Sequence, residues 1–123
     1  MRPPRLLVVD DNRALRDVWC DALTLFGYEV VPADNGAEAL ALFQARPFDL
    51  VLTDLVMPGM SGWQLAEAIG TRSPIVLISG SADAADIERA RRHGIRLLLK
   101  PLQLPDLRRA VEEMLRSRHA PAS

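Results

Sequence analysis

Residues 50–62 read L-V-L-T-D-L-V-M-P-G-M-S-G, and this stretch gives the clearest indication of the fold. It opens with an apolar run that lacks strict polar alternation, which is typical of a strand buried on both faces. The run ends at Asp54, and Pro58 and Gly59 then indicate a turn. The stretch therefore predicts a buried strand that carries a carboxylate at its C-terminal end.

Similar apolar runs recur along the chain and alternate with segments of helical spacing. The predicted strands are Leu6–Val9, Tyr28–Val31, Leu50–Thr53, Ile75–Ser79 and Ile95–Leu99. The apolar faces of the predicted helices are Leu15, Val18, Trp19, Ala22 and Leu25; Ala37, Leu40 and Ala41; Leu65, Ala66 and Ile69; Ile87 and Ala90; and Leu104, Leu107, Val111, Met114 and Leu115. Strands that alternate with helices predict an α/β fold, with a parallel sheet covered on both faces.

The composition is that of one ordinary globular domain. Of the 123 residues, 49% are hydrophobic and 25% are charged, and the net charge is −1. This balance predicts no direct nucleic-acid binding, and the apolar runs are too short for membrane insertion. A single cysteine and an N-terminus without an apolar secretion signal favour the cytoplasm. We expect one domain over residues 1–123, with a core from about 5 to 116 and short loose ends.

Polar side chains gather where the predicted strands end. Asp10 and Asp11 follow the first strand, and Asp54 follows the third. Ser79 ends the fourth strand, and Lys100 follows the fifth. Ligands bind outside the carboxyl ends of parallel strands, so these side chains should share one rim of the sheet. Clustered carboxylates suit a hard cation such as Mg²⁺, and a carboxylate can also attack phosphorus.

Each of these residues also has an ordinary structural explanation. Asp10 and Asp11 would suit a polar turn before a helix, Ser79 would suit the start of a loop, and Lys100 could be solvated. Their coincidence at the ends of several strands favours a shared chemical role, because an ammonium and a hydroxyl are the groups that stabilise phosphoryl oxygens.

Four segments together resemble the receiver domain of two-component response regulators. They are V-V-D-D-N (8–12), L-T-D-L-V-M-P-G-M-S-G (52–62), L-I-S-G (77–80) and L-L-K-P (98–101). The resemblance covers the chain from about Arg5 to about Arg116. It implies a flavodoxin-like, doubly wound α/β/α fold: a five-stranded parallel sheet of order 2-1-3-4-5 with five helices, the first and fifth on one face.

The resemblance also implies roles for the acidic residues. Asp54 matches the phosphorylated aspartate, Asp11 the direct magnesium ligand, and Asp10 the acid that binds the metal through water. Asp54 and the backbone carbonyl of Val56 would complete the protein ligands of Mg²⁺, or of Mn²⁺ in its place.

Two further residues would act on the phosphoryl group. Lys100 would pair with it, and Ser79 would be the hydroxyl that moves toward it on activation. The resemblance further implies a cis peptide between Lys100 and Pro101, a state that is rare without proline.

Two positions shape how such a domain would behave. Leu97 occupies the place of an aromatic residue that turns inward in most receivers, so the loop from Ser79 to Asp86 is expected to carry the switch, with Gly80 loosening its backbone. The resemblance also implies that Val56 and Ser81 occupy the two variable positions that flank the site, and an apolar Val56 cannot orient a water molecule. This predicts slow to moderate self-dephosphorylation.

The expected function is a phosphoacceptor switch in a phosphorelay, not a conventional enzyme. The implied partners are a histidine kinase or phosphotransfer protein and an unknown target or output domain, with the chain as a monomer or a weak phosphorylation-dependent dimer.

Alternatives are a degenerate receiver that only binds proteins, or the receiver segment of a hybrid histidine kinase. Met1 fits a free-standing protein, whereas the tail after Arg118 fits either a true end or a linker. A flavin or nucleotide enzyme would need a glycine-rich loop where Asp10-Asp11-Asn12 stands.

Overall fold

Five strands form a parallel sheet in the order β2-β1-β3-β4-β5, which confirms the predicted topology. They are β1 (Arg5–Val9), β2 (Glu29–Ala33), β3 (Leu50–Asp54), β4 (Ile75–Ser79) and β5 (Arg96–Leu99). The structure is a computed structural model that describes residues 2–119, with side chains as far as Arg116.

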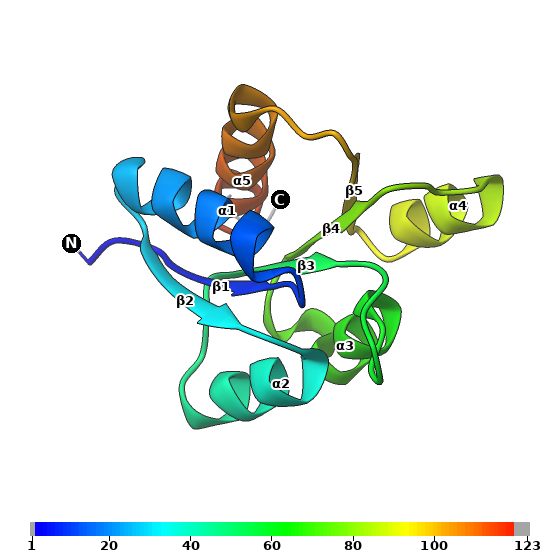
Figure 1. Cartoon of the computed structure of the whole chain (residues 1–123), viewed down its shortest axis with the longest axis horizontal. Helices are drawn as coiled ribbons and strands as arrows, with labels where there is room; N and C mark the ends of the chain where they lie inside the picture. Colours follow the sequence, from blue (N-terminus) through cyan, green and yellow to red (C-terminus); the bar gives the residue numbers. More distant parts are fainter. Residues whose placement is uncertain (1, 120–123) are drawn as a thin grey trace.

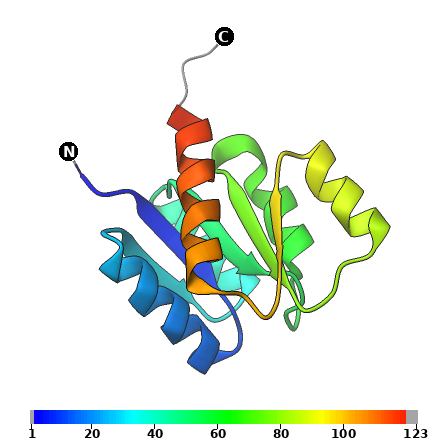
Figure 2. The same cartoon turned by 90° about the horizontal axis from the view of Figure 1, so that it is seen from above.

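The helices lie on both faces of this sheet. They are α1 (Arg13–Leu25), α2 (Gly36–Ala45), α3 (Gly62–Ile69), the short 3-10 helix η1 (Gly70–Arg72), α4 (Ala84–Arg92) and α5 (Leu104–His119). Helices α1 and α5 cover one face and α2 and α3 the other, while α4 lies beside β5 (Figure 1). Seen from above, α4 stands apart from α1 and α5 (Figure 2).

The ends of the chain differ in part from the loose ends predicted. Helix α5 continues through Arg116 to His119, whereas residues 2–4 form no helix or strand. Residues 1 and 120–123, with most of the predicted tail, lie outside the described part of the chain. None of the helices within residues 2–119 combines the length and the apolar character that a membrane crossing requires.

Alternation along the central strands builds a core on each face of the sheet. In β1, Leu6 and Val8 pack with the apolar faces of α1 and α5, whereas Leu7 and Val9 pack with those of α2 and α3. Strands β3 and β4 are buried along their whole length, but β2 and β5 are partly exposed. The prediction of burial on both faces thus holds for the centre of the sheet and is wrong for its edges.

Several predicted helix faces are wrong in detail. The residues predicted to face the core but exposed in the structure are Val18, Leu25, Ala37, Ala41, Ile87 and Leu104. On α1, Trp19 and Ala22 are buried as predicted, and Arg16 and Leu23 are buried beside them. On α2, the buried residues are Gly36, Ala39 and Phe43. In α2 apolar residues occur all around the helix, so their spacing does not define one face. In α1 the buried face includes an arginine, which a search for apolar residues passes over.

Gly62 sets the close approach of α3 to the end of β3. Its N–H donates to the Leu55 carbonyl at 2.8 Å. A Cβ at this position would lie 2.5 Å from the carbonyl oxygen of Asp54 and 2.9 Å from the Cα of Leu55. The preceding Ser61 and Gln64 form a capping box that starts the helix here. The glycine is therefore required because backbone packs directly on backbone beside Asp54.

We predict that Gly62→Ala lowers the free energy of unfolding by about 2 kcal/mol or more, because the added methyl group meets rigid backbone atoms. Urea unfolding measures the change. Gly80→Ala is the matched control: no heavy atom lies within 4 Å of its would-be Cβ, so its effect should stay within about 0.5 kcal/mol. Equal effects of the two substitutions would contradict this account of Gly62.

Candidate functional site

The sheet brings the predicted polar residues to one rim. Asp10 follows β1, and Asp54 and Ser79 are the last residues of β3 and β4. Lys100 follows β5, and its backbone N–H donates to the Ser79 carbonyl at 2.8 Å. Asp10 is fully buried, Ser79 and Asp54 are almost so, and Asp11 is exposed. The site thus has a buried floor and one acid open to solvent.

Three carboxylates form the floor and edge of the site. Asp10, Asp11 and Asp54 each offer an oxygen atom, and these oxygens lie within 4.8 Å of one another. Asp10 Oδ1 accepts a hydrogen bond from the Asn12 N–H at 2.9 Å. Its other oxygen, Oδ2, is buried without a hydrogen-bond partner among residues 2–119. An unpartnered buried carboxylate oxygen beside two more carboxylates fits a hard metal cation with oxygen ligands.

The surroundings of Asp10 disfavour its charged form. Burial raises the pKa of the Asp10 carboxyl, and the nearby Asp54 and Asp11 carboxylates raise it further. The hydrogen bond from the Asn12 N–H and the charge of Lys100 act in the opposite direction and lower this pKa. Without a cation, ionisation of the Asp10 carboxyl therefore lowers the stability of the fold.

Lys100 supplies a positive charge on the other side of Asp54. Its Nζ lies 3.2 Å from Asp54 Oδ2, and 5.9 Å from the centroid of the Trp19 ring. The Lys100 side chain is only partly exposed, which strengthens this ion pair relative to one in open solvent. The Lys100–Pro101 peptide is cis, which confirms that prediction.

Ser79 and Val56 stand at the margins of Asp54. The Ser79 hydroxyl donates to the Ser81 carbonyl and accepts from the Ser81 N–H at 3.2 Å, so it is engaged with the loop that leads to α4. The Val56 N–H lies 3.5 Å from Asp54 Oδ1, and the Val56 side chain is largely exposed. The roles predicted for the Ser79 hydroxyl and the Val56 carbonyl stay predictions.

Arg16 belongs to this region, and sequence reasoning missed it. Its side chain is 9% exposed, and its Nη1 donates to the Asp10 carbonyl at 3.0 Å and pairs with the Asp34 carboxylate. The available signal was spacing, because Arg16, Trp19 and Leu23 fall on one helical face. A charged residue in register with core positions points to a buried partner.

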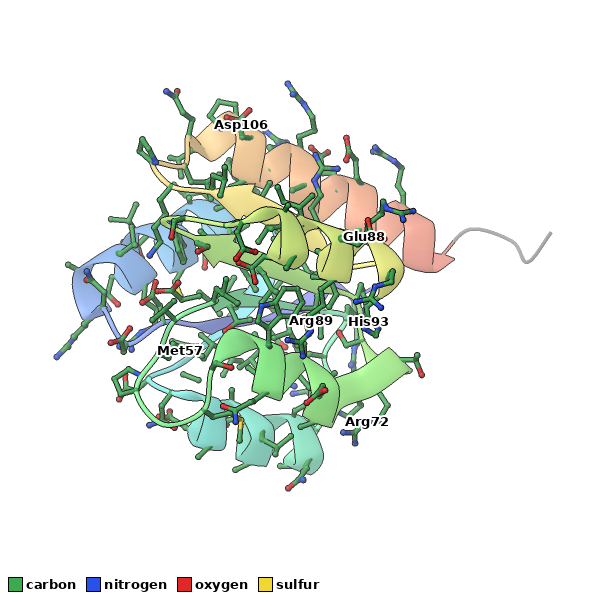
Figure 3. The ribbon with its side chains drawn as sticks, turned by 90° about the vertical axis from the view of Figure 1, so that its right-hand side faces the viewer. Met57, Arg72, Glu88, Arg89, His93 and Asp106 are labelled. Atoms are coloured by element: carbon green, nitrogen blue, oxygen red, sulfur yellow. The ribbon has the colours of Figure 1, made fainter. Side chains whose placement is uncertain are left out.

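A second feature missed from the sequence links α3 to α4. Trp63 Nε1 donates to Asp86 Oδ1 at 3.2 Å, and the Arg89 guanidinium carbon lies 4.5 Å from the centroid of the Trp63 ring. Arg89 also pairs with Glu67 of α3 at 3.6 Å, and Figure 3 shows Arg89 between the two helices. Ala90 is the one buried residue of α4, so these contacts are a large part of what holds the helix.

Comparisons with known proteins agree with this geometry. The family model described as the response regulator receiver domain matches residues 6–112. The chain is 37% identical over 115 residues to the response regulator receiver protein CpdR of Brucella abortus, covering 90% of this chain and 96% of that protein. It is also 39% identical over 119 residues to the sensor histidine kinase GacS of Pseudomonas protegens, covering 89% of this chain and 13% of the kinase.

Solved structures show the same fold. The Vibrio cholerae chemotaxis protein CheY4 superposes with a TM-score of 0.84 at 27% identity, covering 91% of this chain and 98% of that one. The chain spans half or less of the length of several other curated relatives, which include transcriptional regulators and sensor proteins.

We predict that Asp10→Asn stabilises the chain in the absence of divalent cations by about 1 kcal/mol, the usual size of a single stabilising substitution. The amide keeps an oxygen for the Asn12 N–H but removes a buried charge. The pKa of Asp10 is raised by folding from 3.8, so the folded chain holds this proton more tightly than the unfolded chain. The advantage of asparagine should therefore grow as pH rises through the raised pKa, and vanish below 3.8.

Urea unfolding in EDTA over a pH series measures this difference. Asp17→Asn is the control, because the Asp17 carboxylate is 58% exposed on α1, and its stability difference from wild type should be small. An Asp10→Asn variant less stable than wild type at neutral pH would contradict the conclusion that the ionised Asp10 carboxylate destabilises the fold.

Proposed function

Since the chain belongs to the response regulator receiver domains of two-component systems, we propose that it accepts a phosphoryl group on Asp54 from a phosphohistidine donor. The observation that carries this proposal is the placement of Asp54. Its carboxylate lies at the end of β3, 3.2 Å from the Lys100 ammonium and within the cluster formed with Asp10 and Asp11.

The transfer uses the nucleophilic oxygen of Asp54. This oxygen attacks phosphorus in line, the new P–O bond forms, and the P–N bond to the donor imidazole breaks. The imidazole leaves as a neutral ring when the other ring nitrogen of the phosphohistidine already carries a proton. The Lys100 ammonium, already beside Asp54, is close enough to pair with the phosphoryl oxygens after transfer.

We propose that Asp10, Asp11, Asp54 and the Val56 carbonyl hold Mg²⁺, or Mn²⁺ in its place. When bound, the cation supplies positive charge that stabilises the phosphoryl oxygens and relieves the repulsion among the carboxylates. The buried Asp10 Oδ2 without a partner among the described residues supports this assignment, because it remains available to bind the metal or its water. The exposure of Asp11 leaves a path for the cation to enter.

The output is proposed to pass through the loop after β4. In the structure the Ser79 hydroxyl is engaged with Ser81. If it turned toward a phosphoryl group on Asp54, those bonds would break and the start of the loop to α4 would be freed. Leu97 packs against the core from β5 and has no ring to move inward. The signal therefore has to leave by another contact.

Trp63 supplies that contact in our proposal. It follows Gly62, which packs on the Asp54 backbone, and it reaches Asp86 in the first turn of α4. Asp86 also caps that turn, because its Oδ2 accepts from the Asp83 N–H at 3.2 Å. A change at Asp54 or at Ser81 would thus alter how α4 is held.

Two further parts of the proposal concern lifetime and context. Val56 presents only methyl groups to solvent beside Asp54, so we propose slow to moderate loss of the phosphoryl group, which the decay of label after donor removal would measure.

The donor is proposed to be a histidine kinase or phosphotransfer protein. The similarity to part of GacS also fits a receiver segment of a hybrid kinase, whereas a degenerate receiver is disfavoured because all predicted site residues are present.

Asp54→Asn should abolish labelling by radioactive acetyl phosphate, because an amide oxygen is too weak a nucleophile. The exposed Asp106→Asn variant on α5 is the control and should label like wild type. Gel autoradiography of both variants measures the result. Full labelling of a folded Asp54→Asn protein would overturn the assignment.

Trp63→Phe should loosen α4 by about 1 kcal/mol, because it removes the hydrogen bond to Asp86 but keeps an aromatic ring for Arg89. Hydrogen exchange of the amides in 84–92 should accelerate about fivefold, while the amides of α5 exchange at the wild-type rate. Unchanged exchange in α4 would show that Trp63 does not hold this helix.

A further inference from the structure

We propose that Arg16 is a positioning residue for the cation site: its guanidinium fixes the backbone of Asp10, so that the Asp10 and Asp11 carboxylates face Asp54. This inference rests on the proposed function. Arg16 lies on α1 and contacts no reacting atom, so it would act only through Asp10 and the loops beside it.

The contacts of Arg16 join two loops. Nη1 donates to the Asp10 carbonyl at 3.0 Å and pairs with Asp34 Oδ1. Asp10 is the first residue after β1, and Asp34 is the first residue after β2. The guanidinium therefore ties the C-terminal ends of two neighbouring strands together from the helix above them.

The backbone N–H, the backbone carbonyl and one carboxylate oxygen of Asp10 are each hydrogen-bonded, whereas the other carboxylate oxygen has no such bond among the described residues. Its N–H donates to the Ala33 carbonyl at 3.2 Å, its carbonyl accepts from Arg16, and its Oδ1 accepts from the Asn12 N–H. Oδ2 is the atom left over, and an oxygen of the same carboxylate lies within 4.8 Å of oxygens from Asp11 and Asp54. Rotation of the Asp10 peptide would move this carboxylate, and the bond from Arg16 opposes that rotation.

The partner of Arg16 lies next to the same cluster. Asp34 and Asp11 line one surface depression together with Asn35 and Gly36 at the start of α2 and Met60 of the loop into α3. Asn35 caps α2, and a Cβ on Gly36 would lie 2.8 Å from Met60. The Arg16–Asp34 pair thus anchors the wall that borders the exposed acid.

Stability alone is a weak reason for this arginine. The Arg16 side chain is 9% exposed, and its Nε has no hydrogen-bond partner within the described ranges. Burying a guanidinium with an unpaired N–H is unfavourable, and an apolar side chain of similar volume could fill such a position without that loss. A role in fixing the Asp10 backbone, so that the carboxylates face Asp54, accounts for the charge.

Arg5 offers a matched control at the other end of β1. Its side chain is 14% exposed and pairs with Glu29 at 2.8 Å. Its Nη1 also donates to two backbone carbonyls, those of Arg46 at 3.3 Å and Pro47 at 3.1 Å. Arg5 and Arg16 therefore make the same kinds of contact, but only Arg16 contacts the acidic cluster.

The test titrates Mg²⁺ alone into wild type, Arg16→Met and Arg5→Met by calorimetry, with thermal unfolding in EDTA measured in parallel. Arg5→Met should lower the unfolding temperature, and Arg16→Met should lower it by no more than Arg5→Met does. Only Arg16→Met should weaken Mg²⁺ binding, by about ten- to a hundredfold, the usual effect of removing a residue that orients a metal ligand. Arg16→Lys should recover, on a logarithmic scale, less than half of the Mg²⁺ affinity that Arg16→Met loses, because an ammonium lacks the planar fork of a guanidinium.

Asp34→Asn serves if Arg16→Met does not fold, because the Asp34 side chain is 66% exposed. It should weaken Mg²⁺ binding severalfold with little loss of stability. Wild-type affinity in either folded variant, or an equal loss in Arg5→Met, would overturn the role of Arg16 while leaving Asp54 labelling intact. A wild-type chain that binds no Mg²⁺ and takes no label would instead overturn the proposed function, and this inference with it.

Discussion

Repulsion among the carboxylates of Asp10, Asp11 and Asp54 is the constraint around which the rest of the site is arranged. The parallel sheet forces these acids together, because β1 and β3 are neighbours and both end at the same rim. Lys100 offsets part of the repulsion from one side of Asp54. Burial raises the pKa of the Asp10 carboxyl, and the nearby Asp54 and Asp11 carboxylates raise it further. In the proposed function, this unbalanced charge makes the site receptive to a cation and then to a phosphoryl group.

The surroundings of Asp54 are tightly packed on one side and sparsely held on the other. Gly62 packs its backbone against the end of β3, so α3 begins at a fixed distance from the acid. Ser79, in contrast, is bonded to a loop, and α4 beyond it buries a single residue. Charge arriving at Asp54 can displace the weakly held element more readily than the strongly held one.

Much of the fold and of the site could be predicted from the sequence, because strands buried at the centre of a sheet have a simple signal. Apolar runs ending in Asp10, Asp54 and Ser79 located three strand ends, and the structure brings these residues to one rim. The helix faces were harder, since α2 is apolar all around and α1 buries Arg16. The contacts of Arg16 with Asp34 and of Trp63 with Asp86 depend on tertiary placement, which side-chain spacing within one helix does not encode.

We propose that Asp54, and no other acid of the cluster, carries the phosphoryl group. The most direct measurement is reductive trapping: the chain is incubated with acetyl phosphate and Mg²⁺, treated with borohydride, and digested for mass spectrometry. Borohydride converts an aspartyl phosphate to homoserine, so the account predicts this conversion at Asp54 alone, and only when Mg²⁺ is present. Conversion at Asp10 or Asp11, or none at all in a folded chain, would contradict it.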